Sequence, residues 1–527
     1  MDKIQHILFI LSFFCYLFVP IKKAIHMIQQ NRYNLKRYSD WLCSSCQQQK
    51  KTIALKYFCM MSCYVLLFVS DKVYPSRLFM MVVCIYAYVS YKLEANNEYR
   101  KPLINTKRVT RLFIAMYGCY LMILGCLLHF ISLQMWIIIT PFLYFTPWIL
   151  LPFAASIMYP IEQQIRNYYV ADAKRLLLLR QDLSIVGISG SYGKTSVKTI
   201  LKTLLSDSFY TLMTPDSYNN KMGITITIRM QLQNLHDIFL CEMGADHVHE
   251  IEQLMDFVHP LFGIVTAIGP QHLQSFHTME NIQHEKMQMI EKLPSNGIGF
   301  LNIDNPYIRS YKIKNTCKII WFGEDEQADY RMCNIHYSEF GTSFEVIYHG
   351  KRHAFSTCLL GEHNVRNITC ALSLAHTFQV PWEKLQVLVQ TLPYVEHRLQ
   401  LMKTKRYTIL DNAYNSNPEG ARCALNVLSQ MSGRHFIVTP GFIDLGKVEK
   451  QENYLFGKRI CESCDEVILV GKIQSEDILK GIREQNFDLN HVHIVSSIRE
   501  AFEIVRKLAT PNDTVLLEND LPDAFNH

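Results

Sequence analysis

The sequence predicts a helical membrane domain followed by two soluble α/β domains. Apolar residues are concentrated in the first 160 of the 527 residues, where five long apolar stretches occur. From about residue 182 onward, strand-like runs alternate with helix-like runs. This alternation is typical of mostly parallel sheets covered by helices. A glycine-containing turn near residue 190 joins the first of these strands to the first of these helices.

The apolar stretches cover residues 4–19, 53–69, 78–91, 112–133 and 136–158. The last two are near or above the ~20 apolar residues that a membrane-spanning helix requires, whereas burial in a soluble core is an alternative for the shorter ones. Basic residues follow the first and third stretches, at residues 22–51 and 92–111. Because basic loops stay in the cytoplasm, we predict a multi-pass inner-membrane domain over residues 1–160, with the rest of the chain cytoplasmic.

A linker helix is predicted over residues 161–181, with basic residues suited to contact membrane lipid. A solvated connector is the alternative. A first soluble domain over residues 182–396 has predicted strands at 184–188, 209–213, 238–242, 262–267, 299–302 and 319–322, and a small antiparallel insert at 327–357. A Rossmann-like domain over residues 397–527 has predicted strands at 407–411, 436–440, 466–470, 491–495 and 514–518.

The net charge of +6 is small for this length, and the basic membrane loops account for it without a nucleic-acid partner. The 16 cysteines include two Cys-x-x-Cys pairs, Cys43 with Cys46 and Cys461 with Cys464. Each pair has the spacing of half a zinc ribbon, but more than 400 residues separate them. Isolated free thiols are therefore the favoured interpretation.

The turn after the first soluble strand reads Gly-Ser-Tyr-Gly-Lys-Thr-Ser, residues 190–196. Glycines let backbone N–H groups approach phosphate oxygens, and the N-terminus of the next helix adds its positive end. Lys194 can reach the β- and γ-phosphates, and the Thr195 hydroxyl can ligate Mg²⁺. An ordinary glycine-rich turn is the alternative. The strand before and helix after favour a nucleotide site formed by Gly190, Ser191, Gly193, Lys194, Thr195 and Ser196.

Three further polar residues follow in order. Glu242 ends a predicted strand, which is where a carboxylate ligand for Mg²⁺ is expected beside a phosphate loop. His272 follows the next strand, and Lys286 lies in a helical segment. Taken alone, each of the last two is more often a solvated surface residue.

Nine motifs in this order resemble those of the Mur ligase superfamily, closest to its members that join D-alanyl-D-alanine to a UDP-N-acetylmuramoyl tripeptide. The resemblance covers about two thirds of the chain. It rests on residues 190–196, Thr214-Pro215 with Asn219-Asn220 and Gly223, Glu242-Met-Gly-Ala245, Gln271-His272-Leu273, Glu285-Lys286, Asn302-Ile-Asp304-Asn305, Gly361-Glu-His-Asn364 with Asn367, His397-Arg398-Leu399, and Asp411-Asn-Ala-Tyr-Asn-Ser-Asn-Pro418.

The resemblance implies that ATP phosphorylates a substrate carboxylate and that an amine then attacks the acyl phosphate. It implies two Mg²⁺ ions, the first held by Thr195 and Glu242, with His272 contributing to the second. Lys286 matches the family lysine that becomes a carbamate and then ligates metal. Lys194, His272 and Lys286 are thus the implied catalytic residues. Asn302 and Asn364 match family positions near the adenine, and Arg398 and Asp411 match positions that reach ATP from the C-terminal domain.

The chain also departs from the family pattern. Membrane stretches stand in place of the family's N-terminal UDP-binding domain. A late Lys-Gly-Ser is replaced by residues 517–520, which include Glu518. Asn453 aligns with a family histidine, and Gln288 stands where glutamate is common.

We therefore predict a membrane-anchored, ATP-dependent amide ligase that adds an amino acid or dipeptide to a peptidoglycan or other envelope-precursor carboxylate. Three alternatives stay open. The first is a folylpolyglutamate- or poly-γ-glutamate-type ligase. The second is a non-ligase P-loop ATPase or kinase, and the third is a membrane scaffold that only binds nucleotide.

Overall fold

The computed structural model describes residues 3–48, 75–95, 102–130 and 143–519, apart from gaps at 32, 216–217, 339–340, 395–396, 398, 414–416, 444 and 472. The chain divides into two compact units, Met1–Tyr168 and Tyr169–His527. Each unit has its own apolar core, so they are considered separately.

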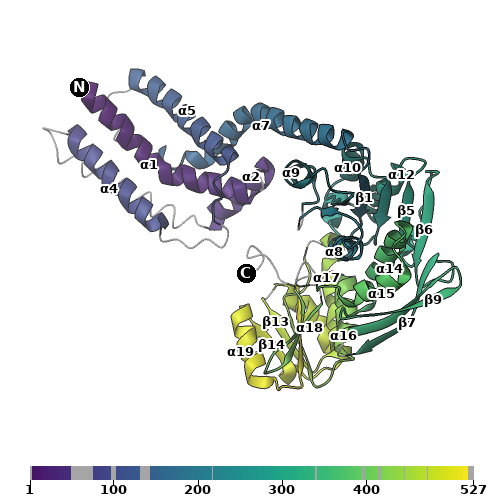
Figure 1. The fold of residues 1–527 in the computed structure, drawn as a ribbon. Helices are drawn as coiled ribbons and strands as arrows, with labels where there is room; N and C mark the ends of the chain where they lie inside the picture. Colours follow the sequence, from purple (N-terminus) through teal and green to yellow (C-terminus); the bar gives the residue numbers. More distant parts are fainter. Residues whose placement is uncertain are drawn as a thin grey trace. The chain divides into compact units, whose positions relative to one another are not determined.

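The first unit is helical. It contains α1 (Lys3–Gln30), α2 (Leu35–Gln48), α4 (Pro75–Ala95), α5 (Lys107–Phe130) and the beginning of α7 (Pro147–Leu178). Helix α1 packs against both α4 and α5 (Figure 1). The core of this first unit contains aromatic residues. Tyr16 and Tyr120 are fully buried in it, and Tyr16 packs against the ring of Tyr144.

Two stretches of the described residues, Leu11–Gln30 and Lys107–Cys126, are long and apolar enough to cross a membrane. A buried core helix or an N-terminal signal sequence passes the same test, so two such helices are weak support for a membrane domain. Helix α4 covers the apolar stretch at residues 78–91 and is not one of the two. The predicted span at 53–69 and the first part of that at 136–158 lie outside the described residues.

The predicted linker helix is not a separate element. Residues Pro147–Leu178 form one continuous helix, α7, which passes through Pro152 and Pro160. A proline inside a helix removes one N–H donor and disfavours the preceding turn, so the sequence suggests a break near Pro160. The apolar residues before that proline and the basic residues after it nevertheless share a single helix.

The middle part of the chain forms a nine-stranded sheet with the order β2-β3-β1-β4-β5-β6-β7-β8-β9. The strands are β1 (Ser184–Ser189), β2 (Thr211–Met213), β3 (Ile238–Glu242), β4 (Phe262–Val265), β5 (Ile298–Asn302), β6 (Lys318–Gly323), β7 (Tyr330–Ser338), β8 (Gly341–Tyr348) and β9 (Lys351–Thr357). Pairing is parallel from β2 to β7 and antiparallel from β7 to β9. The mostly parallel sheet and the antiparallel insert are therefore confirmed.

Helices cover both faces of this sheet, and the side chains of successive residues in β1 point to opposite faces. Val186 and Ile188 belong to the core beneath α8 (Lys194–Leu205) and α14 (Glu362–Thr377). Ile185 belongs to the opposite core, with α9 (Lys221–Gln231), α10 (Glu250–Val258) and α12 (Met279–Glu291). Shorter helices are α11 (Leu273–Phe276), α13 (Pro306–Arg309) and α15 (Trp382–Gln390).

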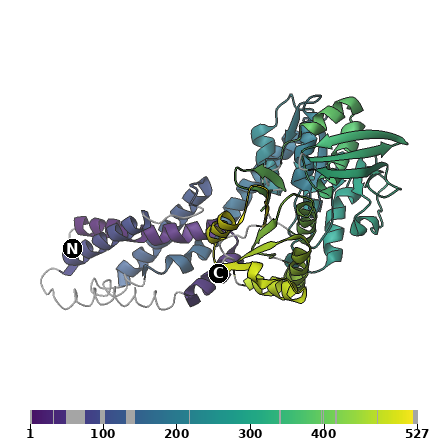
Figure 2. The same cartoon turned by 90° about the horizontal axis from the view of Figure 1, so that it is seen from below.

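The C-terminal part forms a six-stranded sheet with the order β10-β11-β15-β12-β13-β14. It is drawn in yellow-green to yellow in Figure 2. Its strands are β10 (Gln400–Lys403), β11 (Thr408–Asn412), β12 (His435–Thr439), β13 (Glu466–Val470), β14 (Val492–Val495) and β15 (Thr514–Glu518). Only β10 is antiparallel to its neighbour among these pairs. One face packs on α16 (Pro418–Leu428), α17 (Glu449–Ser463) and α18 (Ile473–Glu484), and the other on α19 (Ile498–Leu508). Two 3₁₀ turns, Gly446–Val448 and Leu489–His491, complete the described elements.

Candidate active site

The phosphate loop connects β1 to α8 with two residues in the left-handed region. Gly190 has φ 140° and Gly193 has φ 82°, conformations that side-chain-bearing residues rarely adopt. Lys194 folds back over the loop, and its Nζ donates to Gly190 O at 2.7 Å and to Ser191 O at 3.3 Å. The predicted strand, turn and helix are thus all present, with the lysine held at the mouth of α8.

Gly190→Ala should damage this loop. A Cβ at Gly190 would lie 2.2 Å from Thr266 Oγ1 and 3.0 Å from the Ala267 carbonyl oxygen, in addition to the backbone strain. We expect a loss of about 1–3 kcal/mol of stability, seen as a lower thermal unfolding midpoint, together with loss of ADP binding by calorimetry. Gly350→Ala is the matched control, because Gly350 has φ 76° but open space around its Cβ position. An unchanged ADP affinity in Gly190→Ala would contradict this description of the loop.

Glu242 lies beside the loop because β3 pairs with β1 in parallel, with Ile188 opposite Glu242. Its carboxylate is 2% exposed. Thr195 Oγ1 donates to Glu242 Oε2 at 3.1 Å, and Asn219 Nδ2 donates to Oε1 at 3.2 Å. Burial raises the pKa of Glu242, but the positive charges of Lys198 and Lys194 outweigh that effect and leave the pKa below its ordinary value. The side chain is therefore an anion, as a metal ligand must be.

Lys286 is buried on α12, and His272 lies nearby in a left-handed turn. Lys286 Nζ donates to Ala245 O at 3.0 Å, and His272 Nε2 lies 3.3 Å from Asp246 Oδ1. Burial, and after it the positive charge of Lys194, lower the pKa of Lys286 to about 7. The structure thus brings both predicted residues to the segment just after Glu242.

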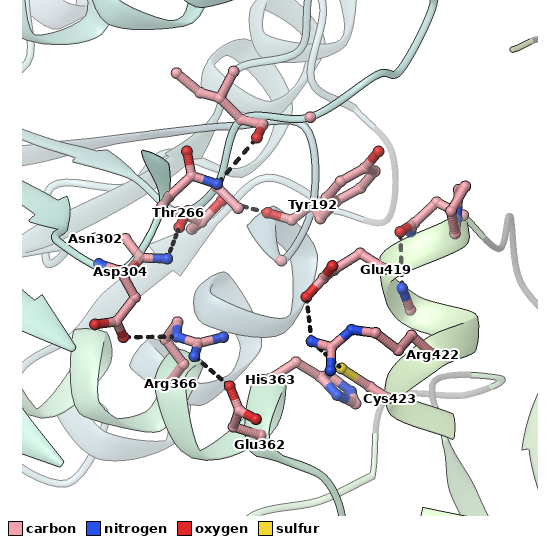
Figure 3. Close-up of a pocket in the computed structure, with 18 of the residues that line it drawn as sticks. Tyr192, Thr266, Asn302, Asp304, Glu362, His363, Arg366, Glu419, Arg422 and Cys423 are labelled. Carbon is pink, nitrogen blue, oxygen red and sulfur yellow. Dashed lines mark hydrogen bonds and ion pairs between the residues drawn. The ribbon is translucent and has the colours of Figure 1, made fainter. Parts of the chain in front are cut away.

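A pocket of about 600 Å³ opens next to the loop (Figure 3). Residues after β4 and β5 line it together with the first turns of α14 and α16. The buried hydroxyl of Tyr192 lines it too and has no hydrogen-bond partner among the described residues. A phosphate loop on one side and a polar cavity on the other fit a nucleoside triphosphate in size and chemistry.

Two arginines that the sequence analysis did not single out, Arg366 and Arg422, also form the pocket wall. Arg366 pairs with Asp304 at 3.2 Å and with Glu362, and Arg422 pairs with Glu419 at 2.7 Å (Figure 3). The pairing of Arg366 with Glu362 could have been predicted from sequence, because the two residues are spaced i, i+4 on one helix. Pairing with Asp304 joins α14 to the end of β5, which the sequence pattern alone does not reveal.

Two predicted adenine contacts, Asn302 and Asn364, are buried and already used within the protein. Asn302 Nδ2 donates to Thr266 O at 3.0 Å, and its Oδ1 accepts from Asp304 N. Asn364 Nδ2 donates to Leu360 O at 2.8 Å. Asn302 lines the pocket, whereas the wall beside Asn364 is formed by its neighbours His363, Arg366 and Asn367.

In the C-terminal part, Asp411 accepts a hydrogen bond from His397 Nδ1 at 2.7 Å, and Arg398 lies outside the described residues. Two positions that depart from the family pattern have internal contacts. Glu518 is fully buried and accepts from Asn412 Nδ2 at 2.9 Å. Asn453 bridges the N–H and carbonyl of Phe442 at 2.9 and 3.0 Å.

Among the described residues, no three or more His, Cys, Asp or Glu side chains are grouped to hold a metal ion. Cys43, Cys461 and Cys464 form no disulfide among the described residues. The oxygen donors Thr195 and Glu242 suit Mg²⁺, which keeps several waters and is usually bound by one or two carboxylates together with substrate phosphates. The donor set therefore fits Mg²⁺ delivered with a nucleotide.

Comparison with known families identifies both soluble domains. The Mur ligase middle domain matches residues 188–375, and the Mur ligase glutamate ligase domain matches residues 397–518. The chain belongs to the Mur ligase family. The resemblance read from the motif order is thus confirmed.

Similar curated Mur ligases are UDP-N-acetylmuramoyl-tripeptide--D-alanyl-D-alanine ligases. That of Buchnera aphidicola subsp. Baizongia pistaciae is 29% identical over 318 residues, which cover 59% of this chain and 69% of the relative. That of Bacillus subtilis is 26% identical over 341 residues, covering 63% and 72%.

Solved structures share the Mur ligase fold. MurF from Acinetobacter baumannii superimposes with a TM-score of 0.61 at 22% identity, covering 67% of this chain and 77% of that one. MurF from Thermotoga maritima in complex with ADP gives a TM-score of 0.61 at 22% identity, covering 67% and 80%.

Proposed function

We propose that the chain is an ATP-dependent ligase that forms an amide bond on a peptidoglycan precursor. The observation that carries the proposal is the loop itself, where Lys194, Thr195 and Glu242 converge beside a polar pocket. The motif order and the names of the relatives support ligation over simple ATP hydrolysis. The proposed substrates are a UDP-muramoyl tripeptide carboxylate and an amino acid or dipeptide amine.

The physical difficulty of this reaction is that two anions, a carboxylate and a triphosphate, must meet. In our proposal the N–H groups of the loop and the N-terminus of α8 bind phosphate oxygens. Lys194 turns from Gly190 O toward the phosphates and offsets their charge. The carboxylate is then aligned with the γ-phosphate, and its oxygen attacks the γ-phosphorus and displaces ADP. The amine attacks the carbonyl carbon of the resulting acyl phosphate, loses a proton and displaces phosphate, which leaves the amide.

Mg²⁺, when bound, supplies further charge neutralisation. We propose that Thr195 and Glu242 hold the first ion and that His272 and Lys286 hold a second. The buried amine of Lys286, with its pKa of about 7, is neutral in a large fraction of molecules at neutral pH. Only a neutral amine reacts with CO₂, so this environment supports the proposal that Lys286 becomes an anionic carbamate.

Both soluble domains contribute to the proposed ATP pocket. Gly193, Thr266 and Asn302 come from the middle domain, while Asn417 and Arg422 come from the C-terminal domain. A site shared in this way is completed when the two domains approach each other. We also propose that Asn364, Arg398 and Asp411 contribute to ATP binding.

We further propose that residues 1–160 anchor the enzyme in the inner membrane, that 161–181 is a basic connector near lipid, and that 182–396 and 397–527 are cytoplasmic catalytic domains. The two apolar helices at Leu11–Gln30 and Lys107–Cys126 support anchoring. Membrane fractionation with carbonate extraction tests it, since a peripheral protein is released and an integral one is retained.

Turnover with defined substrates tests the ligase proposal. Full-length protein in detergent receives ATP, Mg²⁺, bicarbonate and UDP-muramoyl tripeptide, with or without D-alanyl-D-alanine, and phosphate release is followed. Phosphate release that requires the dipeptide supports the proposal. Phosphate release that requires neither the tripeptide nor the dipeptide indicates an ATPase. Nucleotide binding without turnover indicates a scaffold or a different acceptor.

A further inference from the structure

A buried lysine contacts the carboxylate proposed to hold Mg²⁺. Lys198 lies on α8, one turn after Lys194, and its side chain is 1% exposed. Its Nζ lies 2.9 Å from Glu242 Oε2, the same oxygen that accepts from Thr195. Both charges of this pair are therefore enclosed in the protein beside the phosphate loop.

Both carboxylate oxygens of Glu242 have partners within the protein. Oε2 takes Lys198 and Thr195, Oε1 takes Asn219, and the backbone N–H of Glu242 donates to Thr214 Oγ1 at 3.1 Å. A cation next to the carboxylate repels a second cation in a low-dielectric site. Lys198 thus stabilises the anion and at the same time disfavours a metal ion there.

Nucleotide phosphates change this balance. A nucleotide bound at the loop would bring several negative charges close to Lys194, which folds over the same loop. Added negative charge offsets the repulsion between an ammonium and a divalent cation, whereas without nucleotide the Glu242 carboxylate is already paired with Lys198. The described residues around the loop hold no group of three or more metal-binding side chains that would compensate.

We propose that Lys198 is a positioning residue whose ammonium group supplies, in the absence of metal, the positive charge that balances Glu242. In nucleotide-free protein it neutralises and orients the carboxylate and keeps divalent cations away. Metal then enters together with nucleotide, so that the metal site forms only when there is a phosphate to act on. The inference rests on the proposed role of Glu242 as a metal ligand.

Manganese binding to nucleotide-free, full-length protein tests the inference, with free Mn²⁺ followed by electron paramagnetic resonance. Lys198→Met, which keeps the length of the side chain and removes its charge, should bind Mn²⁺ at least tenfold more tightly than wild type without nucleotide. Lys202→Met is the matched control, because Lys202 lies one turn further along α8 and donates to Thr211 O instead. It should bind as wild type does, and so should Lys198→Arg. Equal Mn²⁺ affinity of Lys198→Met and wild type would overturn the proposal.

Glu242→Gln provides a test that does not depend on Lys198→Met folding. Without nucleotide, wild type and Glu242→Gln should bind Mn²⁺ equally weakly. With ADP present, wild type should bind Mn²⁺ at least tenfold more tightly than Glu242→Gln does. A clear loss of nucleotide-free affinity in Glu242→Gln would mean that the carboxylate is open to metal, and the proposal would fail. If ADP binds to no variant, the proposed function fails, while the nucleotide-free comparison of Lys198→Met still decides the role of Lys198.

Discussion

Lys194→Met is expected to lower ligase turnover by about 10²- to 10³-fold, the range typical of removing one preorganised charge-stabilising group. Lys194 is placed at the mouth of α8 by its hydrogen bonds to Gly190 O and Ser191 O. Because its charge is needed most when charge is transferred, kcat should fall far more than ADP affinity does. Steady-state kinetics and calorimetry on the same preparation measure the two effects.

The control for this variant is again Lys202→Met, which removes a lysine from the same helix. Its side chain contacts the backbone of Thr211 rather than the loop, so its kcat should stay within a few-fold of wild type. If Lys194→Met retained wild-type kcat, the loop would not be the site of phosphoryl transfer.

Lys286→Ala is expected to abolish measurable turnover while leaving ADP binding intact. Lys286 is buried, and its amine lies 3.0 Å from Ala245 O in the segment that follows Glu242. Lys286→Arg should be equally inactive, because a guanidinium keeps the positive charge but cannot form a carbamate. Phosphate release and ADP calorimetry are the measurements, and a Lys286→Arg enzyme with wild-type activity would rule out the carbamate.

From the pKa of Lys286 we expect the activity of the enzyme to depend on pH and on bicarbonate. With a pKa of about 7 in the folded protein, the amine becomes increasingly protonated below pH 7 and is then unable to react with CO₂. Removal of CO₂ and bicarbonate should therefore slow the enzyme, and added bicarbonate should restore more activity at pH 8 than at pH 6. Lys292→Ala is a control on the same helical segment, since Lys292 is a surface residue paired with Glu252.

The arrangement of the loop was predictable from sequence because its determinants are local. A buried strand, two glycines and a Lys-Thr pair define the turn, and parallel pairing of β1 with β3 places Glu242 beside Thr195. The alternation of strands and helices likewise predicted both parallel sheets. The order of the strands within each sheet was not predictable, because it depends on contacts between distant segments.

Other features depend on tertiary contacts that leave no local pattern. Lys198 has the sequence appearance of a solvated lysine on an amphipathic helix, and only the fold places it 2.9 Å from Glu242. The hydrogen bond from Asn364 Nδ2 to Leu360 O likewise depends on the fold, and the proposed contact of Asn364 with ATP stays a prediction. The continuity of the helix through Pro160 was also not predicted, because a proline inside an apolar-to-basic sequence is by itself a signal for a helix boundary.

Transfer of an oxygen label tests the central claim most directly. If the substrate carboxylate is labelled with ¹⁸O, acyl-phosphate formation joins one carboxylate oxygen to the γ-phosphorus, and attack by the amine then breaks the carbon–oxygen bond. The account predicts that the released phosphate carries one ¹⁸O from the carboxylate, while the amide product retains the other. Phosphate that carries no ¹⁸O, detected by mass spectrometry alongside full turnover of ATP, would contradict ligation through an acyl phosphate.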